Sequence, residues 1–567
     1  MSATSTPLDA GGGASDAPSN RSRGPLSRLY RRELAEYPPT RRRLAYLAIV
    51  VVTTVVLYYM LYIQYAVATS IMTDFGMTYR YFTWVSVVGN AVGAFASLVA
   101  GLADRWGRAN LVVYGLLTAS LLVLFGLTGA GGKATYLVVF ALVSFVEGLV
   151  LVATPALIRD FSPQLGRATA MGYWTMGPVV GSLVVTVVTS ATLTTSDWRQ
   201  ELRYSGYAGL VVFLMAFPAL RELAPRLRDQ IMVSLHDRAL VEARAKGVDP
   251  AQSRRGEWRQ VLSPGVLGPV FAVAVFLLLY YSAVGNFVVY FATTFGYDEQ
   301  HTNSLATWYW AANALSLVAT GLLSDRLRVR KPFMMAGGIG AAAASLWFAT
   351  RATHPETSYT AFAWTFVAIG VFSGVAYAPW MAGFTETVER RNPAATAVGL
   401  AVWGWVVRIV VAVSAACVPL VVTSVTPLVE HGDQVSAAQR KAGPALAVVT
   451  AHRDLFAQLE KYGDRPPASL TARAAREVGP ADLRLVRRSQ HELSVLQRYG
   501  PQVAKAAEEG PGQWRAWWLV AVGGQVVFLP LVFAMSGRWS PRRAREDAQR
   551  HQAAVDRELA ALAERES

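Results

Sequence analysis

Two charged side chains stand in stretches of sequence that are otherwise apolar, one in each half of the chain. Glu147 lies thirteen residues inside one apolar block, and Arg408 lies about as far inside another. An ionisable group near the middle of a membrane is costly, so such a residue is a functional candidate. A buried carboxylate can exchange a proton near neutral pH, and a guanidinium offers a planar fork to a carboxylate or phosphate. We interpret Glu147 as a proton carrier and Arg408 as an anion-binding residue; the alternative is a structural ion pair.

Uncharged polar and aromatic residues in similar apolar blocks are weaker candidates. An amide can bind a polar solute, but buried amides also join membrane helices by hydrogen bonds. An aromatic ring can wall a cavity or simply fill the space between helices. The candidate substrate-binding residues of this kind are Gln64, Asn90, Asn286, Asn313, Tyr59, Tyr281 and Trp308. Tyr62 and Tyr290 would add to the same aromatic wall.

The elements that must position these residues are membrane-spanning helices. Of the 567 residues, 53% are hydrophobic and 16% are charged, whereas about a quarter of the residues of a soluble protein are charged. A transmembrane helix needs about 20 mostly apolar residues, and twelve such blocks are present. We predict an all-α membrane protein with 12 transmembrane helices. The blocks span roughly residues 44–68, 81–100, 110–130, 135–158, 168–190, 205–220, 264–292, 303–323, 332–350, 359–383, 395–427 and 514–536.

The net charge of +15 is explained by membrane topology rather than by a nucleic-acid partner. If the N-terminus is cytoplasmic, 34 Lys and Arg residues fall on the inner side and only five in the short outer loops. An excess of basic residues in cytoplasmic loops is the rule for membrane proteins. The pattern predicts a multi-pass protein of the cytoplasmic (inner) membrane, surrounded by the lipid bilayer, with both termini in the cytoplasm.

The sequence offers no sign of an enzyme. Cys417 is the one cysteine and lies in an apolar block, so no internal disulfide is possible. No nucleophile elbow, phosphate-binding loop or zinc pattern occurs. We expect no catalytic activity, no cofactor and no metal site.

The sequence contains an internal repeat, in which the second half of the chain resembles the first. Short identical or similar segments recur at offsets of 220 to 227 residues, and several coincide with the starts and ends of the apolar blocks. Repeats of this kind place the substrate between the two halves, near the middle of the bilayer. The matched segments are 57–59 with 279–281, 73–76 with 293–296, 83–84 with 307–308, and 168–172 with 395–399.

One loop motif identifies the family that the chain resembles. Residues 100–108 read Ala-Gly-Leu-Ala-Asp-Arg-Trp-Gly-Arg, and residues 321–328 read Gly-Leu-Leu-Ser-Asp-Arg-Leu-Arg. Both resemble the signature G-x-L-x-D-R-x-G-R of the major facilitator superfamily, although Ala100 replaces the first glycine in one copy and Arg328 the second in the other. The resemblance implies two six-helix bundles with pseudo-twofold symmetry, alternating access of a central site and a monomeric protein.

In that family the motif latches the two bundles together on the cytoplasmic side. Small residues allow helices to approach closely, a carboxylate can accept the free amides of a helix N-terminus, and glycine permits a tight turn. The alternative is that these are ordinary basic loop residues. The resemblance assigns the gate role to Asp104, Arg105, Gly107 and Arg108, and through the second copy to Asp325 and Arg326.

Two further resemblances bear on the direction of transport and disagree. Gly177, Pro178 and Gly181 resemble part of the G-P-x-x-G-G motif of drug/proton antiporters, but Ser182 stands where the last glycine is expected. Residues 144–148 read Ser-Phe-Val-Glu-Gly where many proton-coupled members have R-x-x-Q-G. Because the usual antiporter charge arrangement is missing, we favour uptake.

The pattern of apolar and polar segments divides the chain into regions. Residues 222–245 are predicted to form an amphipathic helix on the inner membrane surface, or else a plain linker. The regions are a disordered cytoplasmic tail (1–43), the N-terminal bundle (44–220), a cytoplasmic linker (221–262), the C-terminal bundle (263–427 and 514–537), an extracytoplasmic insert (428–513) and a charged cytoplasmic tail (538–567).

The insert between the eleventh and twelfth helices is unusually long. It carries 12 Lys or Arg and 10 Asp or Glu residues, and its apolar residues recur at helical spacing. We expect two or three helices that form a small cap over the outer vestibule, or an excursion without a function.

Three functions remain open at this point. The first is a proton-coupled symporter for a small organic anion such as an organic acid, a sugar acid or a sugar phosphate. The second is a proton-coupled antiporter that exports drugs or metabolites, in agreement with the partial antiporter motif. The third, more remote, is a membrane scaffold or sensor that works through the insert at 428–513.

Overall fold

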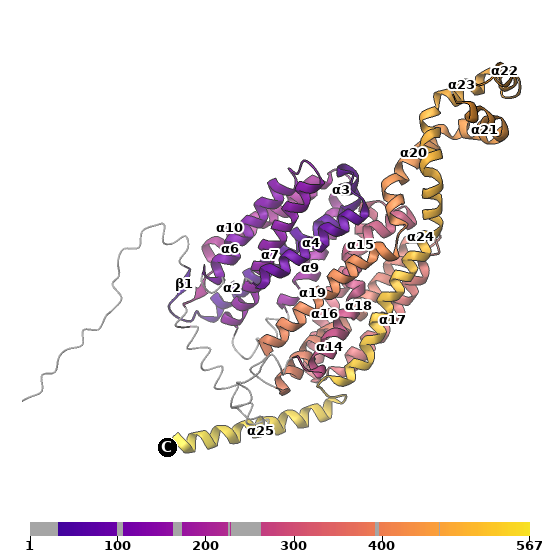
Figure 1. Ribbon diagram of the computed structural model, residues 1–567. Helices are drawn as coiled ribbons and strands as arrows, with labels where there is room; N and C mark the ends of the chain where they lie inside the picture. The colour runs from indigo at the N-terminus through magenta and orange to yellow at the C-terminus, as the bar shows by residue number, and fades with distance from the viewer. Residues whose placement is uncertain are drawn as a thin grey trace, which may run out of the picture.

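The protein is almost entirely helical. The computed structural model describes residues 32–98, 106–162, 173–224, 227, 262–391, 396–463 and 465–566, and Figure 1 shows its long helices side by side. The helices of the N-terminal half are α2 (Thr40–Ala66), α3 (Ala68–Phe75), α4 (Tyr79–Leu98), α6 (Arg108–Leu121), which continues as a π-helix over Leu122–Leu127, α7 (Lys133–Phe161), α9 (Gly177–Thr192) and α10 (Trp198–Ala219).

The C-terminal half repeats this arrangement. Its first transmembrane helix is interrupted at Leu277, as that of the first half is at Val67. Its helices are α14 (Pro264–Phe276), α15 (Leu278–Phe295), α16 (Glu299–Leu327), α17 (Lys331–Arg351), α18 (Tyr359–Arg391), α19 (Thr396–Val421) and α24 (Gln490–Leu531), which ends in a 3₁₀ turn over Val532–Ala534.

The described helices are long and apolar enough to cross a membrane many times. Ten helical segments meet this condition by their own length and composition. The helices α4 and α16 are more polar, but they occupy the places of the second and eighth predicted helices and pack against α7 and α18. The chain is therefore a multi-pass membrane protein with two bundles.

The internal repeat has a structural counterpart at the ends of the first and seventh transmembrane helices. Gly76 ends α3 with φ 57°, and Gly296 ends α15 with φ 67°. Glycine adopts this left-handed conformation without the penalty that a Cβ atom brings. The recurrence of Phe-Gly at both places thus encodes the same helix stop in each half.

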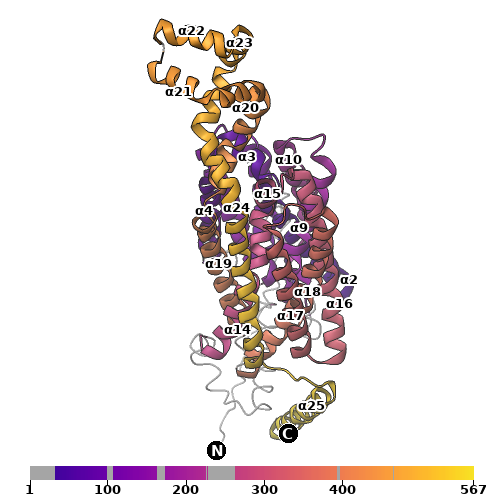
Figure 2. The same ribbon diagram turned by 90° about the vertical axis from the view of Figure 1, so that its right-hand side faces the viewer.

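The insert is a helical stalk. Its helices are α20 (Val425–Ala451), α21 (Arg453–Tyr462), α22 (Ala468–Glu477) and α23 (Pro480–Arg488), and α24 leads from it into the membrane region without a break. Figures 1 and 2 show α21–α23 standing away from the bundles, so the predicted cap over the vestibule is wrong. The helix count is also corrected: four helices form the insert, together with the first part of α24.

Several predicted boundaries shift as well. The eleventh transmembrane helix ends at Val421 rather than at 427, and the twelfth begins within the insert rather than at 514. The backbone N–H of Ser424, at the start of α20, donates to Oε1 of Gln513 on α24, with an N···O distance of 2.9 Å. This bond satisfies a free helix-end donor and joins the start of α20 to α24.

The segment before the first helix is partly ordered, in contrast to the predicted disordered tail. β1 (Glu33–Leu34) pairs in parallel with β2 (Glu222–Leu223), so the linker begins as a short strand rather than a helix. Arg32 is buried, and its Nε donates to Oδ1 of Asn110 at 3.1 Å. Of the predicted amphipathic helix, only residues 222–224 and 227 are described, and residues 1–31 also lie outside the described residues.

Two ends of the molecule can now be defined. The insert end carries α20–α23, and the termini end carries β1 and the C-terminal helix α25 (Pro541–Glu566). Figures 1 and 2 show α25 at the end of the bundles opposite to the stalk. A transported solute would move between these two ends.

Candidate substrate cavity between the two bundles

A cavity of about 280 Å³ lies between the two bundles. Its lining comes from α2, α4, α7 and α9 of the first half and from α14, α15, α16, α18, α19 and α24 of the second. Binding pockets for small molecules commonly measure roughly 300–1,000 Å³. The cavity is therefore of a size that suits a small solute.

Glu147 and Arg408 face this cavity from opposite bundles. Glu147 is on α7 with 6% of its surface exposed, and Arg408 is on α19. They are the only charged side chains among the described residues that line the cavity. They are close enough for the positive charge of Arg408 to act on the carboxylate of Glu147. No group of three His, Cys, Asp or Glu side chains able to hold a metal ion occurs within the described ranges.

Three of the predicted amides also line the cavity, but each makes hydrogen bonds within the protein. Nδ2 of Asn90 donates to the carbonyl of Ser86 at 2.9 Å, and Nδ2 of Asn313 donates to the carbonyl of Gly370 at 3.0 Å. Oδ1 of Asn286 accepts from the hydroxyl of Tyr79, with an O···O distance of 2.6 Å. The last bond joins the two bundles.

Four buried polar atoms beside the cavity have no hydrogen-bond partner among the described residues. They are Oγ of Ser144, the hydroxyl oxygen of Tyr280, Nε1 of Trp403 and Oε1 of Gln525. Buried polar groups are normally paired. Three of these four carry a hydrogen that they can donate, so the surroundings of the cavity favour an electron-rich ligand.

At the insert end, a single carboxylate joins the bundles. Glu299, the first residue of α16, accepts hydrogen bonds from Oγ1 of Thr69 at 2.6 Å and from the backbone N–H and Oγ of Ser70 at 2.8 and 2.7 Å. Both partners belong to α3 of the other bundle. Hydrogen bonds to a charged acceptor are stronger than neutral ones, so this contact favours closure of the insert end.

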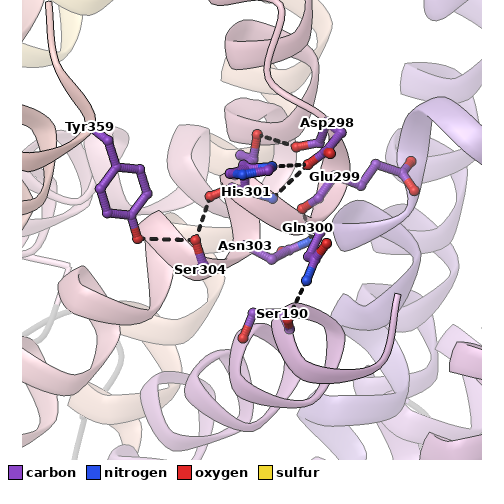
Figure 3. A network of polar contacts seen from close by, with 9 residues as sticks. Ser190, Asp298, Glu299, Gln300, His301, Asn303, Ser304 and Tyr359 are labelled. Atoms are coloured by element: carbon purple, nitrogen blue, oxygen red, sulfur yellow. Dashed lines mark hydrogen bonds and ion pairs between the residues drawn. The ribbon is translucent and has the colours of Figure 1, made fainter. Parts of the chain in front are cut away.

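Neighbouring residues of α16 extend the same contact, as Figure 3 shows. Nε2 of Gln300 donates to the carbonyl of Ser190 at 3.1 Å, and Nδ2 of Asn303 donates to the carbonyl of Ala66 at 2.8 Å. Asp298 caps α16 by accepting from the backbone N–H of His301. Partial burial acts to raise the pKa of Asp298, but the hydrogen bonds from His301 hold it below its usual value.

At the termini end, the first copy of the loop motif organises the N-terminal bundle. Gly107 has φ 89° and precedes α6. The backbone N–H of Arg108 donates to Oε2 of Glu222 at 2.7 Å, and its guanidinium pairs with Asp160 of α7 at 2.9 Å. Asp104 and Arg105 lie outside the described residues.

The second copy of the motif makes comparable contacts in the C-terminal bundle. Asp325 pairs with Arg330 at 2.6 Å, and Arg330 also pairs with Glu386 of α18 at 3.0 Å. Arg326 is exposed. Arg328, which replaces the second glycine of the motif, has φ 55° and is the one described non-glycine residue with positive φ. The motif therefore requires a backbone with positive φ at this position even where glycine is missing.

Comparison with protein families decides the identity of the fold. The profile of the Major Facilitator Superfamily matches residues 50–415. The chain belongs to this family. A search of curated proteins finds no match. Major facilitator proteins transport small-molecule substrates, and the two bundles and the central cavity agree with this role.

Solved structures of major facilitator proteins are similar in fold. A bacterial homologue of the human lysosomal transporter Spinster, in an inward-facing and occupied conformation, has a TM-score of 0.56 at 15% identity, covering 87% of this chain and 97% of that chain. A D-xylose–proton symporter has a TM-score of 0.52 at 13% identity, covering 67% and 90%. At such low identity these likenesses establish the fold alone.

Three predicted binding residues do not line the cavity. Gln64 and Tyr59 are buried inside the N-terminal bundle, where Oε1 of Gln64 accepts from the hydroxyl of Tyr136 at 3.2 Å. Trp308 is 51% exposed on the outside of the protein. Successive residues of an α-helix point about 100° apart, and each of these three is one residue away from a tyrosine that does line the cavity: Tyr65, Tyr58 and Tyr309.

Several residues of the cavity were not predicted. Tyr62 of the expected aromatic wall does line the cavity, whereas Tyr290 is buried within the C-terminal bundle. A stripe signal was available for Tyr58 and Tyr65, because they follow helical spacing with Tyr62 on one face of α2. For the others no local signal distinguishes a lining residue from a packed one. The remaining unpredicted polar or aromatic members include Tyr79, Trp174, Tyr280, Tyr377, Trp403 and Gln525, whereas the predicted Tyr281 does line the cavity.

The partial antiporter motif has a packing role in this structure. A Cβ atom on Gly177 would lie 2.6 Å from Cγ2 of Thr54, and one on Gly181 would lie 2.6 Å from Cβ of Tyr58. Both distances are shorter than van der Waals contact, so glycine allows α9 to approach α2. Pro178 lies in the first turn of α9, where its missing N–H is not needed, and also lines the cavity.

Proposed function

We propose that this major facilitator protein is a symporter that moves a small organic anion together with a proton across the cytoplasmic membrane by alternating access. The observation that supports this most is the pair of Glu147 and Arg408, which come from opposite bundles and are the only charged residues among the described cavity lining. A pair of opposite charges in a site of low dielectric is far less costly than either charge alone.

The charge balance of this pair suggests how the two substrates are coupled. Before loading, the negative charge of Glu147 compensates the positive charge of Arg408. When an anion binds to Arg408, the negative charge of Glu147 loses its compensation, and protonation of the carboxylate restores neutrality. Anion and proton thus load together, and the cavity carries no net charge in either state when the bundles move.

The orphaned polar atoms support an anionic solute. Oγ of Ser144, the hydroxyl of Tyr280 and Nε1 of Trp403 can each donate a hydrogen bond and lack a partner among the described residues. An anion rich in lone pairs can accept from such groups. A lipophilic cation cannot, and Arg408 would repel it.

The distribution of basic residues supports an orientation of the molecule in the membrane. The segments predicted to be cytoplasmic carry most of the basic residues, so by the positive-inside rule we take the termini end to face the cytoplasm. The contact of Glu299 with α3 then closes the cavity toward the outside. Alternating access requires this contact to break when the outward-facing state forms.

The proposal is tested by transport into liposomes. Thermal unfolding of the purified protein with benzoate, succinate, gluconate or glucose 6-phosphate first identifies a stabilising anion. Uptake of that anion is then driven by an imposed pH gradient. We expect Arg408→Ala to weaken binding about 10- to 100-fold, as the loss of hydrogen bonds to a charged group implies. We expect Glu147→Gln to lose accumulation driven by the pH gradient while it keeps anion exchange.

The control is Arg453→Ala in the insert, which removes an exposed arginine far from the cavity and leaves uptake unchanged. Accumulation that survives in Glu147→Gln would contradict the proton-carrier role. Stabilisation by tetraphenylphosphonium that persists in Arg408→Ala would instead favour the efflux antiporter and make Arg408 structural.

A further inference from the structure

The cavity is lined by aromatic rings far more densely than the chain as a whole. Thirteen of its 41 lining residues are Phe, Tyr or Trp, against 11% of the whole chain. Most of these rings are the phenols of tyrosine, and both bundles contribute them. The eight tyrosines are Tyr58, Tyr62, Tyr65, Tyr79, Tyr280, Tyr281, Tyr309 and Tyr377.

On each side of the cavity, neighbouring tyrosine rings are tilted or edge-to-face rather than stacked. Tyr58 and Tyr62 of α2 have ring centroids 5.3 Å apart with planes inclined by 47°. Tyr280 and Tyr281 of α15 are 4.9 Å apart at 79°. In tilted and edge-to-face pairs part of a ring face stays uncovered, and such a face attracts the edge or the offset face of another ring.

The two sets of phenols lie close to the charged pair. Tyr58 is within electrostatic range of both Glu147 and Arg408, and of Tyr281 on the other bundle. Tyr281 is in turn within range of Arg408. A ring held between the tyrosines of the two bundles therefore places a carboxylate attached to it near the guanidinium.

Three of the four amides of the lining argue against a sugar or a sugar acid. Binding several hydroxyl groups needs donors and acceptors that are free to turn toward the solute. Nδ2 of Asn90 and Nδ2 of Asn313 are instead bonded to backbone carbonyls, and Oδ1 of Asn286 accepts from Tyr79. The cavity therefore suits a solute with an aromatic ring and a negative charge better than a solute with many hydroxyl groups.

Building on the proposed anion symport, we propose that the solute is an aromatic carboxylate, with its carboxylate on Arg408 and its ring between the tyrosines of α2 and α15. A cavity of about 280 Å³ accommodates one or two rings. The tyrosines thus determine which anion is accepted, whereas Arg408 determines that the solute is an anion.

The test compares two acids that differ only in their ring. Benzoate and cyclohexanecarboxylate carry the same charge on rings of the same number of atoms, but only benzoate is aromatic. Binding of both to the full-length protein in lipid nanodiscs is measured by calorimetry, together with gluconate and tetraphenylphosphonium. We expect benzoate to bind at least tenfold more tightly than cyclohexanecarboxylate, and binding of both acids to fall in Arg408→Ala.

Variants of Tyr58 test whether its ring causes the preference for benzoate over cyclohexanecarboxylate. Tyr58→Phe keeps the ring and should keep the benzoate/cyclohexanecarboxylate ratio, whereas Tyr58→Leu should lower it at least threefold. The ratio is taken within one preparation, so a loss of folded protein does not change it. Tyr114→Leu, on the outside of the N-terminal bundle and 36% exposed, is the control and should leave the ratio unchanged.

The outcomes separate this inference from the function on which it rests. Equal affinities for the two ring acids, or a preference for gluconate, would overturn the aromatic substrate class while anion symport stands. Binding of tetraphenylphosphonium with no binding of any acid would overturn both.

Discussion

At the scale of single residues, Glu299 accepts more hydrogen bonds from the opposite bundle than any other described residue. It accepts three hydrogen bonds from Thr69 and Ser70 although it begins a helix of the other bundle. Each hydrogen bond to a charged group contributes about 1.5–3 kcal/mol. The carboxylate therefore biases the protein toward the state in which the insert end is closed.

This bias can be measured with a cysteine placed in the contact. In a Cys417→Ser background, Ala66→Cys introduces a thiol at a residue that is 4% exposed and whose carbonyl accepts from Asn303. We expect Glu299→Gln to raise the rate of thiol alkylation about tenfold, because a loss of roughly 1.4 kcal/mol changes the open population by that factor.

Asp298→Asn is the matched control for this measurement. Asp298 is adjacent in sequence and also acidic, but its carboxylate bonds to His301 of the helix that it caps. The alkylation rate should stay within twofold of the parent. An unchanged rate in Glu299→Gln would show that the closed insert end does not depend on this carboxylate.

At the scale of elements, close approach of α2 and α9 positions one wall of the cavity. Gly181 faces Tyr58 and the carbonyl of Val55, and an added Cβ atom would lie 2.6 Å from Cβ of Tyr58 and 3.0 Å from that carbonyl oxygen. Protein interiors are close-packed, so such an overlap forces the helices apart. Because Tyr58 lines the cavity, the separation of these helices also sets the shape of the site.

We therefore expect Gly181→Ala to destabilise the protein by about 1–3 kcal/mol, the typical cost of overpacking, and to lower the affinity for the transported anion. Gly523→Ala in α24 is the control, because Gly523 is exposed and has nothing within 4 Å of an added Cβ. Alanine favours the helix over glycine by roughly 0.5–1 kcal/mol, so this variant should be neutral or more stable. Thermal unfolding compares the two, and equal stability would contradict the packing argument.

At the scale of the whole molecule, the stalk and the membrane bundles have separate cores. Leu455, Ala474 and Val478 form a small cluster at the tip of the insert that is distinct from the main core. The stalk itself is held by α20 packing along α24, with the rings of His431 and Tyr499 stacked at 3.9 Å. Among the described elements, α20 also contacts α3 and α4 of the N-terminal bundle and α15 of the C-terminal bundle.

Removal of the tip together with most of the stalk should therefore leave transport intact. A variant in which residues 433–505 are replaced by a short Gly/Ser loop keeps the bond between Ser424 and Gln513. We expect uptake within about threefold of the full chain and a similar melting temperature of the membrane region. Complete loss of uptake by a folded variant would point instead to the scaffold or sensor role of the insert.

The architecture could be predicted from the sequence because each element carries its own signal. Long apolar blocks specify membrane helices, and the repeated Phe-Gly at Gly76 and Gly296 specifies matching helix ends. The family followed from the Asp-Arg motif copies, and the place of Glu147 and Arg408 in the cavity lining followed from the cost of a charge in an apolar block. The boundaries of the insert were less accurate, since α24 continues across the polar–apolar transition at 514 without a local stop signal.

Only the tertiary structure decided which face of each helix meets the cavity. Tyr59, Gln64 and Trp308 lie next to lining tyrosines in sequence, yet a rotation of about 100° per residue turns them into a bundle or toward the outside. In a membrane helix every face is apolar, so hydropathy does not mark the cavity side. Glu299 escaped notice for a related reason: its importance depends on Thr69 and Ser70, 230 and 229 residues away in the chain, which only the packing of the two bundles brings within hydrogen-bond distance.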